Sequence, residues 1–162
     1  MRKILILLGV VAILAAGCGS DSSKTSSSTP VQLPGNTTNK GTKDISGASV
    51  DVEIDDYYFS PTFLRGGAAG STITVHLKNQ GKQPHTFTSP ELKVDKQLNP
   101  GESADVQVTL PQSGASEFHC TFHQQSNGMQ GAFFFKDGDT VAAAGAPSGD
   151  NTTTTAGGYY GN

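Results

Sequence analysis

The feature that most constrains this chain is a set of short segments in which apolar and polar residues alternate. The alternation runs through the segments 50–55, 72–78, 105–110 and 118–122, and 132–136 is a short aromatic strand. A period of two places successive side chains on opposite faces of a β-strand. Turn-forming stretches rich in Gly, Asn and Pro separate these segments, and no long segment has helical periodicity. The pattern therefore predicts an all-β protein with a Greek-key β-sandwich.

Composition divides the 162 residues into one domain and two flanks. Apolar residues make up 35% and charged residues 15%, which is low for a compact globule, so part of the chain is expected not to fold. Residues 18–49 are dominated by Ser, Thr, Gly, Asn, Lys and Pro, and predict a flexible linker. Residues 139–162 are similarly biased and predict a disordered tail, in which Tyr159 and Tyr160 have no explanation. The folded domain is placed at 50–138.

The first residues have the pattern of an export signal. Arg2 and Lys3 precede an apolar run over 4–16, which is shorter than the roughly 20 residues needed to span a bilayer. The run ends in Leu-Ala-Ala-Gly-Cys at 14–18, which resembles the lipobox of bacterial lipoproteins. This resemblance implies that residues 1–17 are removed as a signal peptide. It also implies lipid on Cys18 and anchoring on the outer side of the cytoplasmic membrane, periplasmic or at the cell surface. The alternative is an ordinary signal peptide that is cleaved elsewhere.

Charge and cysteine content exclude several classes of protein. With 11 basic and 14 acidic side chains, the chain lacks the positive excess of a nucleic-acid-binding protein. Two cysteines are too few for a disulfide-dense scaffold, an all-cysteine zinc site or an all-cysteine iron–sulfur centre. If Cys18 carries lipid, Cys120 is the remaining thiol in an oxidising compartment. A metal ion would protect it from oxidation.

Cys120 belongs to a cluster of residues that bind soft metals. The sequence reads Cys120-x2-His123-x5-Met129, and His85 lies roughly 35 residues before the cysteine. Thiolate, thioether and imidazole together favour copper over magnesium or calcium, and two His with one Cys and a distant Met is the ligand set of blue-copper sites. The alternatives are a plain buried thiol, two ordinary surface histidines and a methionine that fills the core.

These residues and their surroundings resemble the cupredoxin family of blue copper proteins over about 50–138. The resemblance also includes Tyr-Phe-Ser-Pro at 58–61, the segment 79–87 and the Leu-Asn-Pro-Gly-Glu turn at 98–102. It implies one mononuclear type 1 copper site whose ligands are His85, Cys120, His123 and Met129. Family members commonly carry Asn after the first His, where this chain has Thr86, and the Thr86 hydroxyl is expected to brace the ligand loop. Three glutamines are alternative axial ligands, since Gln substitutes for Met in such sites: Gln124, Gln125 and Gln130.

Aromatic and histidine residues around the ligands have predicted roles too. Four phenylalanines are expected to shield the thiolate from water, which would tune the reduction potential. They are Phe87, Phe118, Phe122 and Phe133. His123 is expected to be the more exposed ligand and the port for electrons. His76 and His119 fall on the polar sides of their segments and are predicted to face solvent.

The acidic group at 51–56 could suggest a calcium site. It consists of Asp51, Glu53, Asp55 and Asp56. No Gly-centred EF-hand loop follows it, and a solvated strand face is the preferred interpretation.

Two classes of function remain. The chain has no Gly-x-Ser-x-Gly, Walker or His-Glu-x-x-His motif, and we predict neither enzyme activity nor a small-molecule substrate. The first class is a one-electron carrier that exchanges electrons with redox proteins of a respiratory or photosynthetic chain. The second is a copper protein for storage, delivery or resistance. Such proteins usually need exposed Met- and His-rich ligands, and the scarcity of Met favours the carrier.

Overall fold

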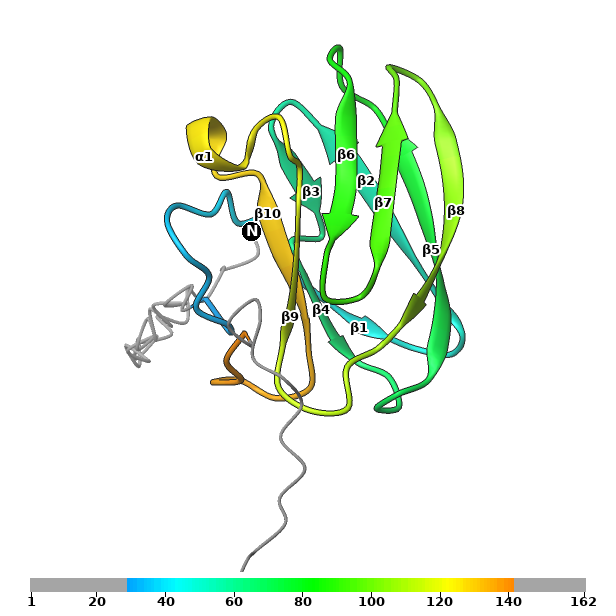
Figure 1. The fold of residues 1–162 in the computed structure, drawn as a ribbon, viewed down its shortest axis with the longest axis vertical. Coiled ribbons are helices and arrows are strands. Elements are labelled where there is room, and N and C mark those ends of the chain that lie inside the picture. The colour runs from blue at the N-terminus through cyan, green and yellow to red at the C-terminus, as the bar shows by residue number, and fades with distance from the viewer. Residues whose placement is uncertain (1–28, 142–162) are drawn as a thin grey trace, which may run out of the picture.

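Two β-sheets pack face to face in a computed structural model that describes residues 29–141 (Figure 1). The six-stranded sheet has the order β1 (Thr42–Ile45), β4 (Phe63–Gly66), β10 (Gln130–Phe134), β9 (Ser116–His119), β6 (His85–Ser89) and β7 (Val94–Leu98). The four-stranded sheet has the order β3 (Tyr58–Ser60), β2 (Ser49–Asp55), β5 (Thr72–Asn79) and β8 (Ser103–Thr109). One short helix, α1 (Gln124–Asn127), lies between β9 and β10. The predicted β-sandwich is confirmed.

Alternation along the central strands fills the space between the sheets. In β2 the residues Val50, Val52 and Ile54 are buried, whereas the acidic side chains of Asp51 and Glu53 are exposed. Strand β5 has the same alternation and pairs with β2 in parallel. The apolar side chains of the two strands therefore lie side by side on the inner face of the sheet. Apolar burial of this kind is the main driving force for folding. The period of two thus identifies the inner faces correctly.

Strand direction brings the ends of three strands to one end of the sandwich. Strand β9 pairs antiparallel with both β6 and β10, so the start of β6, the end of β9 and the start of β10 are neighbours. The β9–β10 connection, which contains α1, lies at this end (Figure 1). Any side chain carried by these three strand ends or by this connection is therefore placed in one small region.

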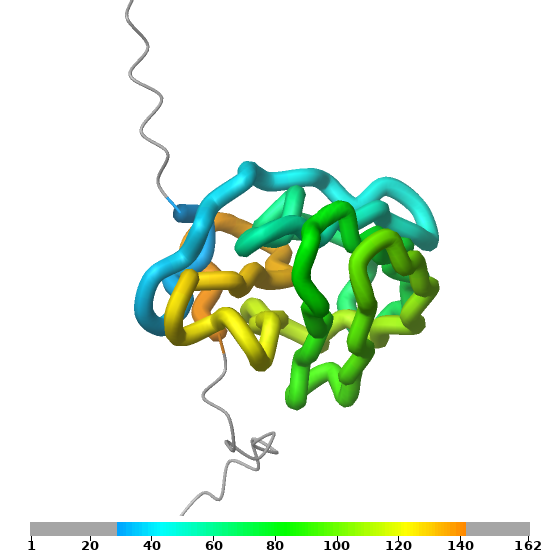
Figure 2. The backbone as a smooth tube through the Cα atoms, turned by 90° about the horizontal axis from the view of Figure 1, so that it is seen from above, coloured from blue at the N-terminus to red at the C-terminus, as the bar shows by residue number. Residues whose placement is uncertain are grey.

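The folded domain begins earlier than the sequence predicts. Residues 29–49 belong to the predicted flexible linker, but β1 (Thr42–Ile45) pairs in parallel with β4 and extends the sheet. The preceding N-terminal strap (residues 29–41) runs beside the β9–β10 connection (Figure 2). Val31 of the strap is 1% exposed, and the Gly41 carbonyl accepts N–H bonds from Thr62 and Phe63. Local composition misses these contacts because their partners are distant in sequence. Cys18 and residues 1–28 lie outside the described residues.

The domain also ends slightly later than the sequence predicts. Asp139 is buried, and its carboxylate accepts the N–H groups of Phe135 and Lys136. Val141 bridges to Ala115. These contacts bring 139–141 into the domain, and the rest of the predicted tail, with Tyr159 and Tyr160, is outside the described residues. Within 29–141 there is no helix with the length and hydrophobicity needed to cross a membrane.

Candidate metal centre

Two of the predicted ligands are held by strand ends. His85 is the first residue of β6 and is fully buried, and Cys120 follows the last residue of β9 and is fully buried as well. The two segments are joined directly, because the Thr86 N–H points to Cys120 Sγ at 3.4 Å and the Thr121 N–H donates to Thr86 Oγ1 at 2.9 Å. The Thr86 hydroxyl thus contacts the ligand loop as expected, and the stability that this contact adds stays a prediction.

The ligand loop between Cys120 and Met129 is closed by its own backbone. The Cys120 carbonyl accepts N–H bonds from His123 and Gln124, and the Cys120 N–H donates to the Met129 carbonyl at 3.0 Å. One helical turn, α1, fills the loop and is followed by its capping residue Gly128, which has a left-handed φ of 65°. A side chain there would be strained, and its Cβ would meet the Asn36 carbonyl oxygen of the strap at 2.6 Å. The loop is therefore a compact unit that depends on a glycine.

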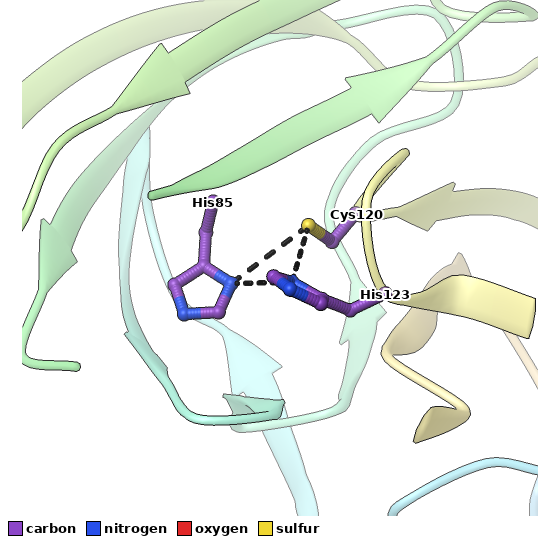
Figure 3. A group of neighbouring side chains, drawn as sticks. All are labelled: His85, Cys120 and His123. Carbon is purple, nitrogen blue, oxygen red and sulfur yellow. Dashed lines mark hydrogen bonds between the residues drawn. The ribbon is translucent and has the colours of Figure 1, made fainter. Parts of the chain in front are cut away.

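Three donor atoms converge at this end of the sandwich (Figure 3). Cys120 Sγ lies 3.4 Å from His123 Nδ1 and 3.8 Å from His85 Nδ1, and the two ring nitrogens are 3.2 Å apart. All three atoms lie within 4.8 Å of one another. The structure thus brings together three residues that are separated by up to 38 positions in the sequence.

The chemistry of these donors fits a cation. His85 Nε2 lies 2.8 Å from an Asp56 carboxylate oxygen, and because an ionised carboxylate only accepts hydrogen bonds, this contact favours the tautomer in which Nε2 carries the ring hydrogen. His85 Nδ1 then presents a bare lone pair to the His123 ring nitrogen and to the thiol sulfur. A soft metal ion would replace these close contacts between donor atoms with bonds to a shared centre. Two imidazoles and a thiolate are a set that suits copper.

The protonation state of His123 is consistent with metal binding. Burial lowers the pKa of the His123 imidazole below its ordinary value, and the neighbouring His85 lowers it further, although Asp56 opposes the effect. A lowered pKa keeps the ring neutral near pH 7, which is the form that binds a metal. His123 is partly exposed whereas His85 is 0% exposed, so His123 is the more exposed of the two, as predicted, and its role as the electron port stays a prediction.

Met129 lies at the end of the ligand loop, and its side chain is fully buried against the core. Its role as axial ligand stays a prediction. Among the alternative axial residues, Gln130 directs its amide nitrogen to Pro34 and Asn36 of the strap, at 2.7 and 2.9 Å from their carbonyls. Gln124 bonds to Gln130 and to Glu117, and Gln125 is exposed. The amides of Gln124 and Gln130 are therefore already engaged elsewhere.

Aromatic packing behind the site matches three of the four expected residues. Phe87, Phe118 and Phe133 are buried and in contact, with ring centroids of Phe87 and Phe118 4.7 Å apart. Phe122 does not belong to this group, because 53% of it is exposed and its ring lies 6.1 Å from that of His123. Its segment leaves the sheet after His119, so strand alternation does not apply to it. The expected shielding role of Phe122 is wrong.

Residues of the β2–β3 turn contact the site, and the sequence interpretation missed them. Asp56 bonds to His85, and the Tyr57 ring centroid lies 4.6 Å from that of His123. The Lys82 N–H is the main reason that the pKa of the Asp56 carboxyl is below its ordinary value; the His85 ring acts in the same direction, and burial opposes both. Asp56 belongs to the acidic group for which a solvated strand face is the preferred interpretation of the sequence. It follows Asp55 directly and so breaks the alternation of Asp51, Glu53 and Asp55, but nothing in the sequence indicates its contact with His85.

The two remaining histidines lie away from the donor cluster. His76 is on the outer face of the four-stranded sheet, where its ring bonds to Asp105 at 2.8 Å and its side chain is 43% exposed, as predicted. His119 was also expected to face solvent, but only 17% of its side chain is exposed, beside Glu117. Packing of the β9–β10 connection over this face accounts for the difference, since Gln124 of α1 contacts the same Glu117.

Comparison with known families agrees with this geometry. The profile of the family described as Cupredoxin-like domain matches residues 11–133. The chain belongs to the cupredoxin-like domain family. Within residues 29–141 this cupredoxin has one mononuclear type 1 copper site, with copper as its cofactor, where His85, Cys120 and His123 converge. A comparison with the curated protein sequences found no match.

Solved structures with a similar fold include other copper proteins. Dithionite-reduced auracyanin from Roseiflexus castenholzii is 18% identical, with a TM-score of 0.46, and the match covers 60% of this chain and 99% of that one. Auracyanin A, a "blue" copper protein from Chloroflexus aurantiacus, is 21% identical with a TM-score of 0.43, covering 54% and 99%. The metal-binding domain of the Cu(I)-exporting ATPase CopA from Streptococcus pneumoniae is 11% identical with a TM-score of 0.49, covering 64% and 98%.

Proposed function

We propose that this cupredoxin is a one-electron carrier, anchored by lipid on Cys18 at the outer face of the cytoplasmic membrane. The observation that carries the proposal is the convergence of a buried thiol sulfur and two ring nitrogens within 4.8 Å, on segments that are bonded to one another. One-electron exchange is the chemistry that a bound copper ion supplies. Its partners would be redox proteins, and neither a nucleic acid nor a small-molecule substrate is expected.

The scaffold around the donors supports a carrier. Electron transfer is fast when the ligands keep nearly the same positions in both oxidation states of the metal. His85 is held from behind by Asp56, and Cys120 is held by the sheet and by the Thr86 N–H. The ligand loop is closed between the backbones of Cys120 and Met129. These contacts resist movement of the donors without requiring the metal.

The surface near His123 suggests where electrons would enter and leave. His123 is the partly exposed member of the donor set, and the neighbouring Phe122 places a largely exposed aromatic ring beside it. An exposed aromatic ring next to a partly exposed ligand favours brief, weakly polar contact with a redox partner. A tether of lipid and linker would keep the domain near membrane-bound partners.

The two cysteines allow an experiment with an internal control. By analogy with blue copper proteins, the copper-loaded protein should absorb strongly when oxidised, and the colour should disappear on reduction and return on reoxidation. We expect Cys120→Ser to abolish the colour and to leave membrane association intact. We expect Cys18→Ser to keep the colour and to release the protein from membranes. Absorption spectra and membrane fractionation of both variants measure these outcomes.

Each part of the proposal has its own contradicting result. Colour that persists in Cys120→Ser would remove the thiolate from the copper site. Continued membrane association of Cys18→Ser would remove the lipid anchor and leave the copper site unaffected. A colourless copper that chelators extract readily from the unaltered protein would favour storage or delivery over electron transfer.

A further inference from the structure

We propose that Asp56 is a positioning residue for copper, which sets the tautomer of His85 and places a fixed negative charge behind it. The inference rests on the copper site that the proposed function uses, and it holds whether or not the chain carries electrons. Asp56 lies in the β2–β3 turn, which contributes no copper ligand. This turn would nevertheless control the ligand His85.

The contact between the two residues is short and shielded. Asp56 Oδ1 lies 2.8 Å from His85 Nε2, the His85 side chain is 0% exposed and the Asp56 side chain is 23% exposed. A carboxylate accepts hydrogen bonds, so it selects the tautomer in which Nε2 carries the hydrogen. The opposite ring atom, Nδ1, is then free of hydrogen and faces Cys120 and His123. The other tautomer would point an N–H at the metal position.

The Asp56 carboxylate is itself held in place by the turn before β6. Its Oδ2 accepts the Lys82 N–H at 2.9 Å, and its Oδ1 also accepts the Gln83 N–H at 3.3 Å. A Cβ at position 81 would collide with this carboxylate, so this position requires glycine. Two backbone donors and a fitted space thus orient the carboxylate before any metal binds.

Asn79 organises the same turn. Its side-chain oxygen accepts the Gly81 N–H at 2.9 Å, and its amide donates to the carbonyls of Gln83 and Leu98 at 2.9 and 3.0 Å. The Asn79 side chain is fully buried, so these three bonds satisfy a polar group that would otherwise be costly. The chain of contacts runs from Asn79 through the turn to Asp56, and from Asp56 to His85.

The consequence for the metal follows from electrostatics and from geometry. Partners that bond to the far nitrogen of a ligating His typically change metal affinity by about 10- to 100-fold. A negative charge behind the ligand also stabilises the more highly charged oxidation state, so its removal raises the reduction potential. If the cupric affinity fell tenfold more than the cuprous affinity, the potential would rise by about 59 mV.

Asp56→Asn is the informative variant because it keeps the shape of the side chain. Its carbonyl oxygen can satisfy either the Lys82 N–H or His85 Nε2, and the amide nitrogen then takes the other position. When the amide nitrogen faces His85, it donates to Nε2 and favours hydrogen on Nδ1, the wrong tautomer for binding. We therefore expect the variant to populate both tautomers in the copper-free protein.

The control is a second Asp–His pair with the same separation. Asp105 Oδ1 lies 2.8 Å from His76 Nδ1 on the outer face of the other sheet, away from the donor atoms. Asp105→Asn removes the same charge from the protein and changes the same kind of contact. It should therefore leave the His85 tautomer unchanged and the copper affinity within about twofold of the original.

Two measurements test the proposal on the full chain. Nitrogen-15 NMR of the copper-free protein reports the His85 tautomer, and titration with cupric ion reports the affinity. We expect Asp56→Asn to populate the second tautomer and to weaken cupric binding by about 10- to 100-fold. An unchanged tautomer, or an affinity loss no larger than that of Asp105→Asn, would overturn the proposal. Asp56→Ala, which removes the acceptor entirely, should weaken binding at least as much, and an affinity like that of the control would overturn it too.

Failure of the Asp56 proposal can be distinguished from failure of the proposed function as an electron carrier. The tautomer is measured without copper, and the cupric affinity is measured without an electron-transfer partner. A protein that proved to store or deliver copper would still depend on Asp56 in both measurements.

Discussion

Replacing Thr86 with Val removes the hydroxyl that joins the two ligand-bearing segments, and it keeps the size of the side chain. Thr86 is 4% exposed, and its Oγ1 accepts the Thr121 N–H at 2.9 Å. Val offers no acceptor, so this N–H loses its partner in a partly buried position. Leaving such a donor unsatisfied costs about 1–3 kcal/mol. Because Thr121 itself is exposed, some water reaches its N–H, and we expect the free energy of unfolding to fall by about 1–2 kcal/mol.

The other hydrogen bonds around Thr86 keep the loss of stability within this range. The Thr88 hydroxyl contacts Thr86 Oγ1 at 2.9 Å, but it also contacts Asp95 Oδ1 at 2.9 Å and keeps that acceptor in the variant. The Thr86 N–H still points to the Cys120 sulfur, because the backbone is unchanged. The variant should therefore lose stability and keep its copper colour.

Urea unfolding of the copper-free protein measures the effect, and a second threonine provides a matched control. Thr72 Oγ1 lies 3.0 Å from Thr109 Oγ1 on the exposed side of the four-stranded sheet. Thr72→Val should change stability by no more than about 0.5 kcal/mol, as surface substitutions usually do. If both variants unfold at the same urea concentration, the Thr86 hydroxyl does not brace the loop. Loss of copper colour in Thr86→Val would also contradict the reasoning, because it would make the hydroxyl part of the metal-binding chemistry.

Four other changes test separate parts of the structure. Met129→Leu should retain copper and shift the reduction potential in a redox titration, and an unchanged potential would remove Met129 from the axial role. Gln130→Leu should destabilise the protein by about 2 kcal/mol in urea, because strap carbonyls lose their donor, and an unchanged midpoint would mean that the strap adds little. Gly128→Ala should cost at least about 1–2 kcal/mol, because its left-handed φ is strained for Ala and the new Cβ would also meet the Asn36 carbonyl oxygen, and a neutral result would show that the loop can rearrange. The hydrogen bond that the His76 ring donates to Asp105 raises the pKa of His76 in the folded state, so the stabilisation from this pair is complete below the unfolded pKa and is lost as pH rises through the folded pKa. The urea midpoints of the original protein and Asp105→Asn should therefore differ more at pH 5.5 than at pH 9, and an equal difference at both would contradict the pairing.

The sequence by itself determines the inner faces of the central strands and the identity of three converging donors. Val50, Val52 and Ile54 are recognisable because the side-chain period of a strand is a local property. Cys120 and His123 are recognisable because one short loop carries both of them. His85 is singled out from the other histidines by the resemblance of its surroundings to the cupredoxin family. Soft-ligand chemistry then indicates copper without any coordinates.

Only the tertiary structure decides which distant residues support those donors. Asp56 follows Asp55 out of phase with the alternation of its acidic neighbours, but its contact with His85 spans 29 positions and no local feature indicates that partner. The strap has the composition of a linker, yet the bond between Gln130 and Pro34 spans 96 positions. Phe122 continues an alternating pattern but lies past the end of its strand. In each case the outcome depends on which segments the two sheets bring side by side, and no local pattern contains that information.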